Sequence, residues 1–150
     1  MGLRSLVGAG DRSGLFVLPF AIAGLGAWYL APSLVAVPRS AVVDALGFAL
    51  VAPGLVVWAW SVVLILAEVP KGKLITSGPF RLVRHPLYTA VGLLALPGLG
   101  LLLGTWLGLF IGAALYVAAR IFAPEEERAL AQRFGSAWDD YDRNVRVSWL

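Results

Sequence analysis

The chain contains no cysteine and a single histidine, His85, among its 150 residues. The lack of cysteine excludes disulfides, thiolate nucleophiles and cysteine metal sites. It therefore gives no information on whether the protein resides in an oxidising or a reducing compartment. A single imidazole also argues against a histidine-cluster metal site, so we expect no metal. Charged residues are scarce as well, at 14% of the chain, where an average soluble domain has about 25%.

Apolar residues make up 59% of the chain, and the mean hydropathy is +0.82. A globule of this length has too little interior to bury so much apolar surface. We therefore expect a lipid bilayer as the solvent and one integral-membrane domain over residues 1–150. The net charge of +3 does not indicate nucleic acid as a partner, because basic residues also set membrane topology.

Uncharged runs predict four transmembrane helices, at about 14–37, 45–67, 86–102 and 105–122. The first two each cover the roughly 20 residues that a helix needs to cross the hydrocarbon core. The last two come from one uncharged run, Pro86 to Ala119. A single helix of that length would measure roughly 51 Å and overshoot a core of about 30 Å, so we expect a hairpin. Gly98, Gly100 and Gly104 weaken the helix near its middle and indicate the turn.

Charge placement agrees with four spans. The N-terminus, the loop after the second span and the C-terminal tail then share one side, with 11 of the 12 basic residues, and only Arg39 falls opposite. The positive-inside rule puts that side, and hence both termini, in the cytoplasm. Only two basic residues are lysines in a chain rich in alanine, leucine and arginine, which favours a bacterial plasma membrane.

The tail "APEEERALAQRFGSAWDDYDRNVRVSWL" predicts two short amphipathic helices. Pro124 suits a first helical position, and the glutamates after it suit the positive end of the helix dipole. Gly135 is a candidate C-terminal cap, and Ser136 with Asp139 matches a capping box for the second helix. The predicted fold is therefore an all-α bundle of four transmembrane helices with a helical tail on the cytoplasmic side.

The stretch "SGPFRLVRHPLYTA" precedes the hairpin and holds the only histidine. Pro86 fits the first position of the third span, so His85 lies at a helix N-terminus, where free N–H groups favour an anionic or polar ligand group. Gly78 and Pro79 indicate a turn just before it. From these residues alone, two interpretations remain open: His85 caps the helix while the arginines anchor to lipid phosphates, or the segment is a binding loop. For the glutamates, the alternative to a binding role is a solvated first turn that the helix dipole favours.

The combination of "GPFRLVRHPLY" before the hairpin and "EERALAQRFGSAWDDY" after it resembles the isoprenylcysteine carboxyl methyltransferase and phospholipid methyltransferase superfamily. These are integral-membrane enzymes that use S-adenosylmethionine (SAM). The resemblance covers about half of the chain, roughly Lys73 to Val145. Trp138 stands where these enzymes often have tyrosine, and "VRVSWL" replaces the usual Val-Pro-Arg, which leaves the methyl acceptor open.

The resemblance implies that two elements, about 71–90 and 120–145, hold SAM between them. The cofactor-binding residues that it implies are Lys73, Leu74, Gly78, Pro79, Arg84, His85, Pro86, Tyr88, Glu126 and Glu127. The candidate catalytic residues are His85, Arg120 and Glu126.

The chemistry of SAM suggests how such residues would serve. The glutamates can accept hydrogen bonds from an amino group or ribose hydroxyls, and Arg84 can meet the carboxylate. His85 and Tyr88 can hydrogen-bond or stack. An amine acceptor needs a general base, for which His85 or a glutamate is a candidate, whereas a carboxylate acceptor needs none. Arg120 either reaches lipid phosphates or faces inward and orients an anionic acceptor.

Trp58 and Trp60 fall in the middle of a span, where they either pack helices or line a path for a lipophilic acceptor. We therefore predict SAM-dependent methyl transfer to a lipophilic acceptor, either a prenylated or fatty acid-like carboxylate or a lipid headgroup. An NADPH-dependent reductase of the sterol reductase type is an alternative, because it shares His-Pro-x-Tyr and a tail like Trp138 and Tyr141. The glutamate pair and the short chain argue against it. A non-catalytic membrane scaffold is a further alternative.

Overall fold

The computed structural model describes the backbone of residues 4–147 and the side chains of residues 12–147. The helices are α1 (Arg4–Leu30), α2 (Pro32–Val35), α3 (Ala41–Glu68), α4 (Pro86–Thr89), α5 (Leu96–Leu102), α6 (Leu107–Phe134) and α7 (Ser136–Asn144). Short 3₁₀ turns at Val69–Lys71 and Gly78–Arg81 lie between α3 and α4, and a π-helical segment, Ala90–Ala95, joins α4 to α5. The described residues include isolated β-bridges but no strand, so the all-α prediction is confirmed.

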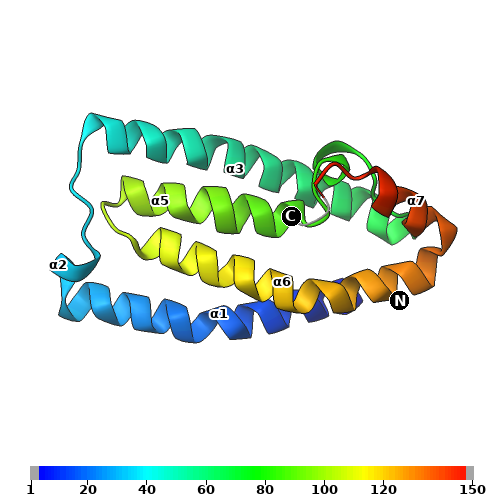
Figure 1. The fold of residues 1–150 in the computed structure, drawn as a ribbon, viewed down its shortest axis with the longest axis horizontal. Coiled ribbons are helices and arrows are strands. Elements are labelled where there is room, and N and C mark those ends of the chain that lie inside the picture. The colour runs from blue at the N-terminus through cyan, green and yellow to red at the C-terminus, as the bar shows by residue number, and fades with distance from the viewer. Residues whose placement is uncertain (1–3, 148–150) are drawn as a thin grey trace.

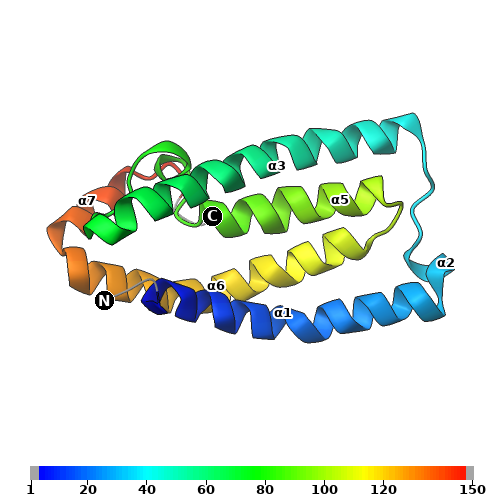
Figure 2. The ribbon, with the colours of Figure 1, turned by 180° about the vertical axis from the view of Figure 1, so that it is seen from behind.

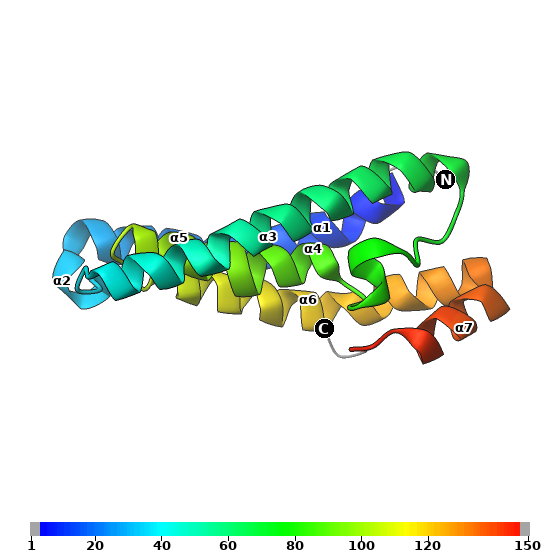
Figure 3. The same cartoon turned by 90° about the horizontal axis from the view of Figure 1, so that it is seen from above.

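The long helices lie side by side in the order α3, α5, α6, α1 (Figures 1 and 2). Thus α1 packs along α6, α6 along α5, and α5 along α3. The α5–α6 turn and α2 lie at one end of the bundle (Figure 3), whereas α7 and the loop between α3 and α4 lie at the other. The beginning of α1 lies at this second end, which we call the α7 end.

Among the described residues, three helical segments are long and apolar enough to cross a membrane, namely Arg12–Leu30, Ala41–Lys71 and Leu107–Phe134. The outer helices expose large apolar side chains, such as Leu15 at 69% and Phe48 at 65%, as expected of surfaces that face lipid. The segment that corresponds to the third predicted span, Pro86–Leu102, is apolar but shorter. It would measure roughly 25 Å against a core of about 30 Å. That it also crosses the membrane stays a prediction.

Glycines allow α3 and α5 to approach each other closely. A Cβ added at Gly98 of α5 would lie 2.7 Å from the carbonyl oxygen of Gly47 on α3. A Cβ added at Gly54 of α3 would lie 2.9 Å from the backbone nitrogen of Ala95. Small residues at helix contacts are the usual way to pack helices in lipid, where van der Waals contact replaces the hydrophobic effect.

The first predicted span, 14–37, extends too far. The α1 helix ends at Leu30, because Pro32 disfavours the helical conformation at the residue before it. Residues 35–37 instead run beside the turn of the predicted hairpin, where the N–H of Val37 donates to the carbonyl of Gly104 (2.8 Å). The hairpin itself is confirmed, since α5 ends at Leu102 and Gly104 has a φ of 68° in the turn.

The predicted tail boundary at Pro124 is wrong, because Pro124 lies inside α6. Its missing N–H removes a single helical hydrogen bond, and the helix continues on both sides with Ala123 buried. Gly135 ends α6 as predicted, with a φ of 52°. The predicted capping box is also wrong, because the N–H of Asp139 donates to the carbonyl of Gly135 (3.2 Å) and not to the Ser136 side chain.

Candidate active site

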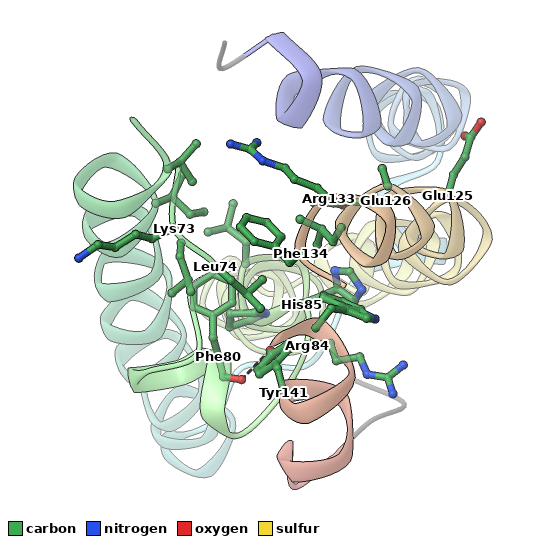
Figure 4. Close-up of a pocket in the computed structure, with 18 of the residues that line it drawn as sticks. Lys73, Leu74, Phe80, Arg84, His85, Glu125, Glu126, Arg133, Phe134 and Tyr141 are labelled. Atoms are coloured by element: carbon green, nitrogen blue, oxygen red, sulfur yellow. Dashed lines mark hydrogen bonds between the residues drawn. The ribbon is translucent and has the colours of Figure 1, made fainter. Parts of the chain in front are cut away.

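The α7 end of the bundle contains a cavity of about 670 Å³. Its walls come from α1, α3, the loop between α3 and α4, α4, α6 and α7 (Figure 4). Small-molecule sites commonly measure about 300–1,000 Å³, so the cavity has room for a cofactor. The two predicted cofactor-binding elements, about 71–90 and 120–145, both contribute to its lining.

The histidine loop is held to α6 by a carboxylate. Pro86 begins α4 and is fully buried, while the His85 side chain makes no capping hydrogen bond. Instead, Nε2 of His85 lies 3.0 Å from Oε1 of Glu127. Nη1 of Arg84 lies 3.5 Å from the same carboxylate, and its Nη2 pairs with Asp142 of α7. Arg84 thereby connects the loop to both α6 and α7.

The glutamates at the start of the predicted tail point in different directions, because successive helical residues turn by about 100°. Glu125 is directed outward (Figure 4), and its Oε2 lies 2.6 Å from Nη1 of Arg12 on α1. Glu127 meets His85. Glu126 lines the cavity, and no cation of the described residues lies within ion-pair distance of it. The cavity therefore presents one carboxylate whose charge is available to a ligand.

An apolar wall closes the other side of the cavity. Trp138 and Tyr141 of α7 are each only 8% exposed, and their rings pack edge to face with centroids 5.6 Å apart. Phe80, Leu74 and Phe134 complete this wall (Figure 4). Phe134, Trp138 and Tyr141 of the tail and Phe80 of the loop were not among the site residues predicted from the sequence. Trp138 and Tyr141 lie three residues apart on α7, and this helical spacing is the signal that could have indicated a shared face.

The segment after α6 fastens the histidine loop in place. The hydroxyl of Tyr141 donates to the carbonyl of Phe80 (2.7 Å). Burial raises the pKa of Tyr141 to about 12. Beyond α7, the N–H of Val147 donates to the carbonyl of Leu82 (2.9 Å), and Val83 forms a bridge with Val147. The tail therefore serves as part of the site and as its support.

Most of the predicted cofactor-binding residues line this cavity: Lys73, Leu74, Arg84, His85, Pro86, Tyr88 and Glu126. Glu127 lies behind His85 and does not line the cavity. Gly78 and Pro79 form the turn that directs the loop, and they do not line it either. Gly78 has a φ of 59°, and a Cβ there would lie 3.0 Å from Nε1 of Trp60, so the turn packs against α3.

The residues predicted to contact the acceptor lie outside the main cavity. Trp58 and Trp60 are 42% and 54% exposed on α3 and are not part of the cavity lining. Arg120 lines a second space, of only about 10 Å³, that also touches His85 and Tyr88. His85 and Tyr88 line both spaces, whereas Arg120 lines only the second one, so its predicted contact with an acceptor stays a prediction.

Within the described part of the chain, no group of three or more histidine, aspartate or glutamate side chains could hold a metal ion. The acidic and basic groups at the site instead pair with one another or face the cavity.

A family model described as phospholipid methyltransferase matches residues 42–137. The chain belongs to this family. The match confirms the predicted superfamily, and it includes the histidine loop and the α6 glutamates. Most of α7, and all of α1, lie outside it. Searches of curated proteins and of solved structures found no significant match. Membership in a methyltransferase family supports an enzyme, and the three long apolar helices support an integral-membrane protein.

Proposed function

We propose that the protein transfers a methyl group from SAM to a lipophilic acceptor at the membrane interface. The observation that carries this proposal is the cavity, which brings the histidine loop and the acidic segment of α6 to one space. These are the two elements that the family resemblance assigns to the cofactor. The family match supports the reaction class.

The side chains around the cavity suit SAM. Glu126 can accept from the ammonium group or the ribose hydroxyls, and Tyr88 offers a further polar group. Phe134 and Trp138 provide an aromatic wall against which an adenine can stack. When bound, SAM supplies an electrophilic methyl group on a sulfonium sulfur.

Glu127 and Arg84 act as positioning residues in this proposal. The charge of Arg84 is already balanced by Glu127 and Asp142, so its main effect is to hold the loop that carries His85. Orienting the reacting groups and excluding water account for much of the rate in such a transfer. Glu127 contributes by holding the imidazole through Nε2.

The acceptor decides whether His85 also moves a proton. An amine acceptor such as a lipid headgroup must lose a proton when it is methylated, whereas a carboxylate acceptor need not. When the Nε2–H of His85 donates its hydrogen bond to Glu127, Nδ1 of the ring can accept the proton that the amine loses. Arg120 lies beyond His85 and Tyr88, where it can orient an anionic part of the acceptor.

The charge distribution supports a cytoplasmic position for the site. Arg12, Lys73, Arg84 and Arg133 all line the cavity at the α7 end. Arg39 lies at the other end, where its side chain is near Gly104. By the positive-inside rule, this distribution favours a cytoplasmic location for the α7 end. A bacterial plasma membrane remains our expectation for the location.

Equilibrium binding to the purified, folded protein tests this function. We expect S-adenosylhomocysteine, the demethylated product, to bind and NADPH not to bind. Binding of NADPH alone would favour the reductase, and binding of neither would favour the scaffold. Methyl transfer from labelled SAM into extracted membrane lipids then identifies the acceptor class.

A further inference from the structure

Four cationic side chains line the cavity, and they are Arg12, Lys73, Arg84 and Arg133. The first three each have a carboxylate within ion-pair distance, namely Glu125 at 2.6 Å, Glu68 at 3.8 Å and Glu127 at 3.5 Å. Arg133 differs, because no carboxylate of the described residues lies within that distance of it. Its charge is therefore available to a ligand.

The exposed Arg133 side chain extends over the cavity (Figure 4). Its guanidinium carbon lies 5.2 Å from the ring centroid of Phe134, a cation–π contact. Its Nη2 lies 3.5 Å from the position that a Cβ on Gly72 would occupy, so it reaches the loop that follows α3. Figure 4 shows the side chain extending from α6 over the cavity toward the wall that carries Lys73.

Arg133 shares a helix face with the available carboxylate. Glu126 and Arg133 are seven residues apart on α6, which is close to two helical turns, so both project to the same side. Along the axis they are separated by roughly 10 Å, and an arginine side chain shortens that gap. The cavity thus offers one carboxylate and one guanidinium to a ligand that carries groups of both signs.

We propose that Arg133 binds the carboxylate of the amino-acid part of SAM, an assignment that rests on the proposed function. The planar guanidinium matches a carboxylate with two parallel hydrogen bonds. From the sequence, Arg84 is also a candidate for this role, but in the structure its charge is balanced by Glu127 and Asp142. Glu126 then serves the ammonium group or the ribose, and the aromatic wall serves the adenine.

The test compares two ligands that differ only in this carboxylate, S-adenosylhomocysteine and its decarboxylated analogue. Wild-type protein should bind S-adenosylhomocysteine more tightly. Arg133→Ala should weaken that binding about tenfold, as expected for the loss of a charge-assisted hydrogen bond, and leave the affinity for the analogue little changed. Arg133→Gln, which keeps most of the length, should behave like Arg133→Ala, and Arg133→Lys should lose less.

Arg128→Ala is the matched control, because Arg128 is an exposed arginine of the same helix that does not line the cavity. It should leave both affinities unchanged. Equal weakening of both ligands by Arg133→Ala and Arg133→Gln would mean that Arg133 only shapes the cavity, and would overturn the assignment. Unchanged binding of both, as expected if Arg133 serves lipid phosphates, would overturn it too. Failure of the proposed function is distinguishable from failure of the Arg133 assignment, because in the first case wild-type protein itself would not bind S-adenosylhomocysteine.

Discussion

Nε2 of His85 lies 3.0 Å from Oε1 of Glu127, which joins two residues 42 positions apart in the chain. The contact fixes the start of α4 against α6 and sets one side of the cavity. Both side chains are mostly buried, with 15% and 25% of their surfaces exposed. A partly desolvated contact of this kind is stronger than an ion pair in water, so the site should depend on it.

Removing the Glu127 carboxylate should loosen the histidine loop. Glu127→Ala leaves His85 and Arg84 without their partner on α6 and should cost about 1–3 kcal/mol in the free energy of unfolding. It should also weaken S-adenosylhomocysteine binding without unfolding the bundle, and His85→Ala should do the same. Equilibrium binding and denaturant unfolding in detergent measure the two effects.

Glu125→Ala is the matched control for the stability effect. Glu125 also pairs with an arginine, Arg12, but these side chains are 66% and 59% exposed. Surface pairs contribute about 0–1 kcal/mol, so this variant should lose little stability. Equal losses from Glu125→Ala and Glu127→Ala would contradict the supporting role of the His85–Glu127 contact.

Tyr141 should make stability depend on pH in the alkaline range. Its pKa is raised to about 12 by burial, whereas a tyrosine in an unfolded chain titrates near pH 10. The raised pKa means that the folded state holds the proton more tightly. The stabilising contribution is complete below about pH 10 and is lost as the pH rises from there through about 12.

In Tyr141→Phe, the loss of stability between about pH 10 and 12 that Tyr141 causes should disappear. The variant should also lower the free energy of unfolding by about 1 kcal/mol, because the hydrogen bond to Phe80 is lost. Ultraviolet titration of the phenolates detects the same group, since the step near pH 12 should disappear in the variant. Tyr29→Phe is the control, because Tyr29 is 88% exposed and its loss should leave that step in place. A step near pH 12 that survives in Tyr141→Phe would contradict the assignment of that step to Tyr141.

Gly98→Ala should separate α3 from α5. The new Cβ would lie 2.7 Å from the carbonyl oxygen of Gly47 and 2.9 Å from Cβ of Leu50, so backbone must shift. Such overpacking typically costs about 1–3 kcal/mol, which a lower midpoint of thermal unfolding would report. Gly26→Ala on α1 meets nothing within 4 Å and should be neutral or stabilising. The same response from both variants would argue against this close helix contact.

Arg120→Ala should weaken the binding of the methyl acceptor and leave the binding of the methyl donor unchanged. Arg120 does not line the main cavity, so S-adenosylhomocysteine should bind as it does to wild-type protein. If Arg120 orients an anionic acceptor, the KM for that acceptor should rise several-fold, as for the loss of one charged hydrogen bond. A fall in S-adenosylhomocysteine affinity comparable to that of His85→Ala would place Arg120 with the donor instead.

Local signals predicted the elements that depend on local chemistry. Pro86 begins α4, and the apolar segment that follows ends at Leu102, as expected from the proline and from the glycines of the turn. The boundary predicted at Pro124 was wrong because a proline is compatible with two positions in a helix. It fits the first turn, and it also fits the interior if one hydrogen bond is lost. Packing of α6 against α1 and α5 favours the continuous helix, and no local pattern records that packing.

The amino-acid sequence by itself determined the all-α, apolar character of the protein and its family, since long apolar runs and two short motifs are properties of contiguous residues. Only the tertiary structure decided which charges cancel: Arg84 is balanced by Glu127 and Asp142, while Glu126 and Arg133 are left to face the cavity. The physical reason is that ion pairing depends on separations of a few ångströms between side chains from distant parts of the chain. Folding brings those side chains together, and the order of the residues does not show which of them will meet.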